Sequence, residues 1–81
     1  MAKPSPSHAG HPFLIALGKV LRSTRLEKGF SQEAVALLAG IDRSYMGGIE
    51  RGEHNLSMVN LHKLAQALNV SISDLIQKSG Y

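Results

Sequence analysis

Only three residues, 39–41 (Ala-Gly-Ile), separate two segments that each have the sequence pattern of a short helix. Ser31 stands before the first segment and Asp42 before the second, and both residue types are favoured as helix N-caps. Gly52 follows the second segment at the position where glycine commonly ends a helix. A connection this short, with glycine inside it, forces a sharp turn between the two helices. The pattern therefore predicts a helix-turn-helix unit, and this unit restricts the possible folds more than any other feature of the chain.

Three further helices are expected, over residues 13–28, 57–68 and 71–78. Leucines recur in the first at a spacing of i, i+3, i+7, and the second carries the cleanest amphipathic stripe of the chain. The third begins with a capping-box-like pair, Ser71 and Asp74. No strand pattern or internal repeat is evident. The expected fold class is all-α, a compact five-helix bundle over residues 13–78. Residues 1–12 contain all three prolines and no apolar periodicity, and we expect a flexible N-terminal arm there.

Length and composition exclude several classes of function. A chain of 81 residues without cysteine forms one small domain without disulfides, which suits a reducing cytoplasm. No apolar run approaches the roughly 18 residues of a membrane span. No nucleophile elbow, phosphate loop or metal-ligand cluster is present, so we expect no enzyme, cofactor, metal or small-molecule ligand. His8 and His11 in the arm are expected to bind nothing. The net charge of +3 favours an anionic partner.

The segment after Asp42 has two different faces. Met46 and Ile49 are spaced three apart and are expected to point into the core. The opposite face is small, polar and basic, and no acidic residue is expected on it. Its members are Ser44, Gly47 and Arg51 at i, i+3, i+7, flanked by Arg43 and Gly48. Such a face suits a helix that enters the major groove of DNA, although a generic solvent-exposed face is the alternative.

Gly47 and Gly48 are unusual because each glycine inside a helix costs about 1 kcal/mol relative to alanine. We expect both to lie on the outer side of the helix, where the core does not require them. Without side chains there, the helix axis can approach the groove floor, and Arg43 and Ser44 can reach base edges from the first turn. The alternative is that the glycines let the helix bend or meet a neighbouring group closely.

The stretch from Leu17 to Ile76 resembles the helix-turn-helix domains of phage repressors, Cro proteins and XRE-like bacterial regulators. The SQE start, the glycine turn, the IERG sequence and the fourth-helix stripe occur together at the spacings of that family. Within the family, "GIDRSYMGGIERGEHNLS" is similar to the small controller proteins of restriction–modification systems. The resemblance implies a sequence-specific transcriptional regulator that binds double-stranded DNA.

The resemblance also implies roles for individual residues. Gln32, at the start of the second helix, matches a glutamine that holds a DNA phosphate. Arg43 and Ser44 match positions that read bases, and arginine bonded to guanine is the commonest specific contact of the major groove. Arg51 and Asn55 match positions close to the DNA backbone.

Other matched positions concern the framework around the helix. Arg25 and Glu50 match a buried ion pair between the first and third helices, with a plain surface pair as the alternative. Gly47 and Gly48 depart from the wider family, which often carries longer polar side chains there. His54 stands where some relatives have arginine.

A single recognition helix reads few bases, so we expect a homodimer on a pseudo-palindromic operator. The short last helix carries more apolar side chains than it needs to seal one core. We predict that three of them form the dimer interface: Ile72, Leu75 and Ile76. No effector domain is evident, which suits a regulator that controls its own operon by dose. An antitoxin-type protein that binds a partner protein as well as DNA is the alternative.

Overall fold

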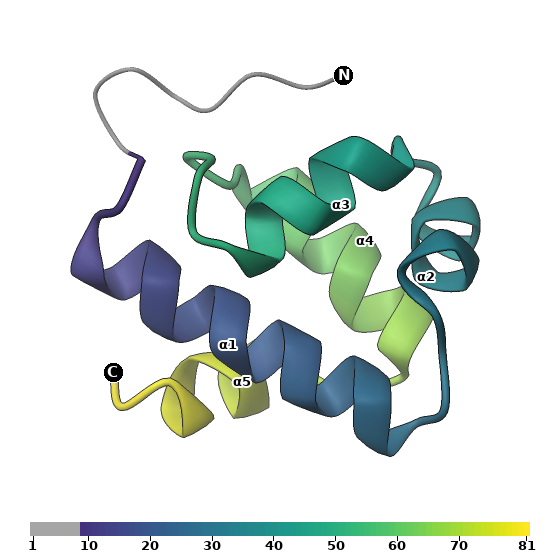
Figure 1. Ribbon diagram of the computed structural model, residues 1–81. Coiled ribbons are helices and arrows are strands. Elements are labelled where there is room, and N and C mark those ends of the chain that lie inside the picture. The colour runs from purple at the N-terminus through teal and green to yellow at the C-terminus, as the bar shows by residue number, and fades with distance from the viewer. Residues whose placement is uncertain (1–8) are drawn as a thin grey trace.

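The computed structural model describes residues 9–81, and five helices account for most of that range (Figure 1). They are α1 (Pro12–Glu27), α2 (Gln32–Ala39), α3 (Arg43–Glu50), α4 (Met58–Leu68) and α5 (Ile72–Lys78). No strand occurs among residues 9–81, so the predicted all-α bundle is confirmed. Residues 1–8 of the expected N-terminal arm lie outside the described residues.

Four of the helices begin at serine or aspartate N-caps. Ser31, Asp42, Ser57 and Ser71 each accept a hydrogen bond from a backbone N–H in the first turn of the helix that follows. These bonds satisfy donors that have no partner within the helix. The turn between α2 and α3 consists of residues 40–42, one residue later than expected, because α2 continues through Ala39.

α1 begins at Pro12, one residue earlier than expected, because proline is well suited to the first helical position. His11 caps this helix, its Nδ1 accepting from the Phe13 N–H at 3.2 Å. The preceding Gly10 N–H donates to the carbonyl of Gly52 at 2.9 Å, so the chain entering α1 is joined to the turn after α3.

All five helices contribute to one hydrophobic core. The largest side chains within it are completely shielded from solvent and come from every helix: Leu21, Val35, Met46, Leu64, Leu68 and Leu75. The place of Leu75 corrects the expected dimer interface. α5 is short, and Leu75 is the one residue it buries in the core of its own chain, so this side chain is not available to a second copy. Ile72 and Ile76 pack at the edge of the core and remain partly exposed.

α1 and α3 pack with their backbones in close proximity at Gly18. A Cβ on Gly18 would lie 2.6 Å from the carbonyl oxygen of Ile49 and 2.7 Å from that of Glu50. Only glycine permits this approach, which holds the last turn of α3 against the middle of α1. None of the described helices is long and apolar enough to cross a membrane.

Candidate nucleic-acid interface

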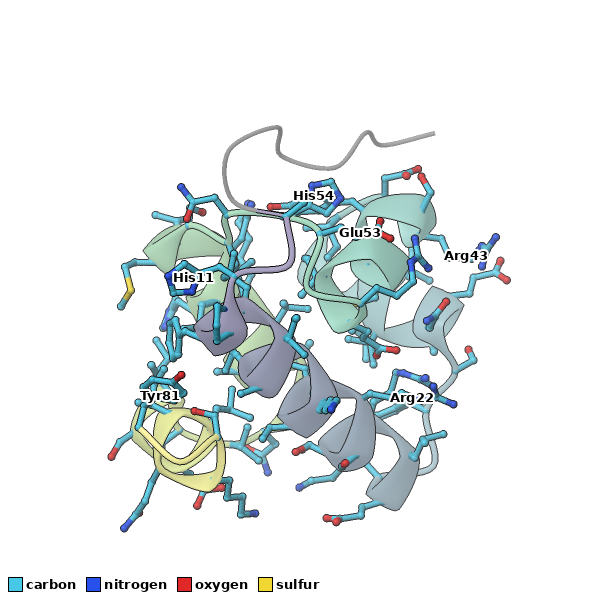
Figure 2. All side chains as sticks on the ribbon, turned by 60° about the vertical axis from the view of Figure 1, so that its left-hand side comes forward. His11, Arg22, Arg43, Glu53, His54 and Tyr81 are labelled. Atoms are coloured by element: carbon cyan, nitrogen blue, oxygen red, sulfur yellow. The ribbon has the colours of Figure 1, made fainter. Side chains whose placement is uncertain are left out.

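The α2–turn–α3 unit lies at one edge of the bundle, where α3 packs against α1 and α2 (Figure 1). Met46 and Ile49 of α3 are buried, as the helical spacing predicted. Arg43, in the first turn of α3, is exposed and extends away from the body of the protein (Figure 2). α3 therefore has one face fixed in the core and a first turn that is accessible from outside.

A buried ion pair fixes the other end of α3. Arg25 Nε donates to Glu50 Oε2 at 2.7 Å and Arg25 Nη2 donates to Oε1 at 3.1 Å, with side chains only 8% and 3% exposed. Arg25 Nη1 also donates to the carbonyl of Phe30 at 2.8 Å. The expected buried pair is confirmed, and a plain surface pair is excluded. Because the guanidinium is a planar fork, two parallel bonds restrict the orientation of α3 as well as its distance from α1.

Gln32 joins the same group of side chains. Its Nε2 donates to Glu50 Oε1 at 2.9 Å, which links the first residue of α2 to the last residue of α3. An amide nitrogen carries two donors, one of which is used by Glu50, and Gln32 is partly exposed. The phosphate contact of Gln32 stays a prediction.

The first turn of α3 is ordered by its cap. The Asp42 carboxylate accepts from the backbone N–H groups of Ser44 at 3.0 Å and Tyr45 at 3.3 Å, and from the Ser44 hydroxyl. The hydrogen bond from the Ser44 hydroxyl is the main reason that the pKa of Asp42 lies below its ordinary value. Ser44 thus supports the helix start, and its contact with bases stays a prediction.

Gly47 and Gly48 are both buried, and the expectation that neither is required by packing is wrong for Gly48. A Cβ on Gly48 would lie 2.4 Å from His54 Nε2 and 2.6 Å from His54 Cδ2. A Cβ on Gly47 would meet only side-chain ends, Arg51 Nη1 at 3.1 Å and Gln32 Oε1 at 3.5 Å. Gly48 is therefore explained by the alternative that glycine allows a neighbouring group, here His54, to approach closely. Gly47 differs, because only the ends of two polar side chains, Arg51 and Gln32, cover it.

His54 is a packing residue of the loop after α3. It is 7% exposed, and its ring lies on Tyr45 with a centroid separation of 4.7 Å. Tyr45 Oη in turn accepts from Asn60 Nδ2 at 3.1 Å, which connects α3 to α4. Within residues 9–81, His54 Nε2 has no hydrogen-bond partner. Sequence patterns did not predict the contact between Tyr45 and His54, because it joins a helix to an irregular loop.

An acidic side chain lies on the face that was expected to have none. Arg51 Nε donates to Glu53 Oε2 at 2.9 Å and Arg51 Nη2 to Oε1 at 3.2 Å. This bond lowers the pKa of the Glu53 carboxyl and raises the pKa of Arg51. The expectation failed because Glu53 belongs to the turn after α3 and has no place in the helical periodicity. Asn55, further along this loop, is exposed.

Arg22 of α1 is a further exposed cation that sequence patterns did not indicate. Figure 2 shows Arg22 and Arg43 on the same side of the molecule. Both suit contacts with an extended anion. Among the described residues, no three His, Cys, Asp or Glu side chains form a group that could hold a metal ion.

Known proteins share this arrangement. The helix-turn-helix family model HTH_3 matches residues 21–75. The control protein C.SmaI of Serratia marcescens is 39% identical over 64 residues, which cover 79% of this chain and 76% of that protein. The crystal structure of the restriction–modification controller protein C.AhdI from Aeromonas hydrophila superposes with a TM-score of 0.75 at 52% identity, covering 76% of this chain and 94% of that one.

A regulator outside the controller group has the same fold. The clp gene regulator ClgR of Corynebacterium glutamicum superposes with a TM-score of 0.81 at 29% identity, covering 84% of this chain and 88% of that one. The similarity therefore extends over most of the domain, including both helices of the α2–turn–α3 unit. The chain belongs to the XRE-like helix-turn-helix family of DNA-binding transcriptional regulators.

Proposed function

We propose that the protein binds a pseudo-palindromic operator as a homodimer and acts as a controller of a restriction–modification operon that includes its own gene. The observation that carries the proposal is the accessible first turn of α3, with exposed Arg43, on a helix whose other end is fixed by the Arg25–Glu50 pair. A rigidly held helix presents its side chains in one geometry, which base readout requires. Similarity to control proteins supports the controller role.

In this proposal Arg43 and Ser44 contact bases, whereas Gln32, Arg51 and Asn55 contact the DNA backbone. An exposed arginine such as Arg43 can form with guanine the two parallel bonds that distinguish this base from the others. The backbone contacts position the duplex and do not read base identity directly.

The dimer interface is proposed on α5, through the partly exposed side chains of Ile72 and Ile76 at the edge of the core. Aspartate at position 72 would stand in the first turn of a helix, where a negative charge is favourable, but Ile72→Asp also removes an apolar side chain packed at the edge of the core, so its melting is measured beside its sedimentation. Ser73→Asp adds the same charge to the same turn at an exposed position and serves as the control. Sedimentation should show dissociation of the first variant and a dimer for the second. Monomer for the parent chain at high micromolar concentration, with operator present, would reject the dimer.

Selection of bound duplexes from a random pool tests the function as a whole. The selected sequences should contain two half-sites with opposite orientation whose centres lie about 34–36 Å apart. The same sequence should occur upstream of the protein's own reading frame and next to restriction and methylation genes. No enrichment, with equal affinity for selected and random DNA at every salt concentration, would reject the proposal.

A further inference from the structure

The Arg51–Glu53 pair places a carboxylate at the proposed DNA surface. Both carboxylate oxygens accept from the guanidinium, at 2.9 Å and 3.2 Å, and the side chains are 61% and 30% exposed. The cation that the proposed function assigns to the DNA backbone is thus already bound to an internal anion. Figure 2 shows Glu53 beside α3, on the side from which Arg43 extends.

The turn after α3 holds this pair in position. The Gly52 N–H donates to the carbonyl of Ile49 at 3.0 Å and the Glu53 N–H donates to that of Gly48 at 2.9 Å, which is a Schellman ending. Gly52 has φ +74°, and a Cβ there would lie 2.8 Å from the main chain of α1, so only glycine fits. Because the backbone is fixed, the Glu53 side chain is kept beside Arg51.

We propose that Glu53 competes with DNA phosphate for Arg51 and thereby raises the specificity of the protein for its operator. This inference rests on the proposed function. A carboxylate and a phosphate accept the same paired bonds from a guanidinium, so one can replace the other. On the operator, base contacts hold the duplex in one register, and a phosphate displaces Glu53. On random DNA no such register exists, so the pair stays closed and Arg51 adds no charge to binding.

The strength of the pair suits this exchange. Exposed ion pairs are weak, so a correctly placed phosphate can open this one. A glutamate carboxylate is ionised at neutral pH and the bond to Arg51 lowers the pKa of Glu53 further, so this carboxylate opposes the DNA backbone. The effect on affinity is therefore several-fold.

Salt dependence of DNA binding separates the two complexes, because each phosphate contact contributes about 0.9 to the slope of log affinity against log salt. Glu53→Gln should strengthen binding to random duplex about three- to tenfold and steepen that slope by about 0.9 per protomer. Operator binding should strengthen less, with an unchanged slope, because Arg51 already contacts a phosphate there. The ratio of operator to random affinity should fall by about threefold.

Two control variants make the test specific to the Arg51–Glu53 contact. Asp74→Asn removes an equal charge from another exposed pair, Asp74 Oδ2 with Lys78 Nζ at 3.2 Å. That pair lies on α5, on the opposite side of the bundle from α3 (Figure 1), and its loss should change both affinities by the same small factor. In an Arg51→Ala background, Glu53→Gln should no longer steepen the slope for random DNA.

Glu53→Gln could change the slope of log affinity against log salt equally for operator and random DNA. Glu53 would then act only as a long-range charge, and the inference would be overturned while the proposed function remains intact. Failure of the parent chain to prefer any selected sequence would overturn both. A lower operator-to-random ratio for Glu53→Gln alone, with parent-like melting and sedimentation, supports the competition.

Discussion

Replacement of Gly48 by alanine should destabilise the protein, whereas the same replacement at Gly47 should stabilise it. Carbon atoms in contact rest about 3.5 Å apart, whereas a Cβ on Gly48 would lie 2.4 Å from His54 Nε2. The imidazole must therefore retreat by about 1 Å. It is buried against Tyr45, so this movement opens the ring contact that the structure shows at 4.7 Å.

The two substitutions share the helix-propensity gain of alanine over glycine, about 1 kcal/mol. Overpacking at a buried site costs about 1–3 kcal/mol, and an approach of 2.4 Å to a buried ring lies at the upper end of that range, so the cost exceeds the gain at Gly48. At Gly47 the nearest atom is the end of the exposed Arg51 side chain at 3.1 Å, which can swing away. The free energies of unfolding of the two variants should therefore differ by about 1–3 kcal/mol. Each kcal/mol corresponds to about 4–8 °C in melting temperature for a domain of this size.

Urea and thermal unfolding at one protein concentration measure this difference, because the melting temperature of a dimer depends on concentration. His54→Ala provides the matched background, in which Gly48→Ala should become stabilising. If Gly48→Ala raises stability as much as Gly47→Ala in the parent chain, the packing of His54 is not the reason for Gly48. If close approach to DNA is the reason for Gly47, Gly47→Ala should weaken operator binding while dimerisation is preserved, and undiminished binding would refute that reason.

Three other predictions concern readout, packing and the helix cap. Arg43→Ala should weaken operator binding by about 1–3 kcal/mol and flatten the preference at one base per half-site, whereas Gln32→Ala should weaken all DNA equally; equal losses on selected and random duplexes for Arg43→Ala would exclude base readout. Gly18→Ala should cost about 3 kcal/mol or more in urea unfolding, because its Cβ would lie 2.6 Å from a fixed carbonyl oxygen. The lowered pKa of Asp42 means that its cap stabilises above its ordinary value of 3.8 and is lost as pH falls through the folded value. Asp42→Asn should therefore weaken the protein at pH 7 and flatten its acid unfolding, and an unchanged acid profile would contradict this.

The helices were predictable from the sequence because their determinants are local. Each N-cap serine or aspartate lies within three residues of the backbone groups that it satisfies, and the apolar stripes repeat within a single helix. The Arg25–Glu50 pair is separated by 25 residues. It was expected from the family resemblance, and composition or periodicity does not predict it.

The remaining contacts depend on how irregular segments fold back. Glu53 and His54 belong to the turn after α3, so no helical period places them beside Arg51 and Gly48. Counting apolar residues in α5 likewise does not show which of them its own core uses, and Leu75 proved to be internal. A helical wheel assigns directions to side chains but does not show which neighbouring segment covers each one.

Glu50 connects the parts of the candidate site. The Glu50 carboxylate accepts hydrogen bonds from Arg25 on α1 and from Gln32 on α2. In addition, the absence of a side chain at Gly18 of α1 allows the Glu50 backbone to pack directly against α1. A buried ion pair contributes little net stability compared with apolar packing, but removing one partner leaves an unpaired charge at a cost of about 3–5 kcal/mol. Apolar contacts would permit α3 to slide or rotate, whereas a forked guanidinium accepts a carboxylate in few orientations. This chain therefore uses directional bonds at the end of α3, where a small rotation would displace Arg43 from the position that the proposed base contact requires.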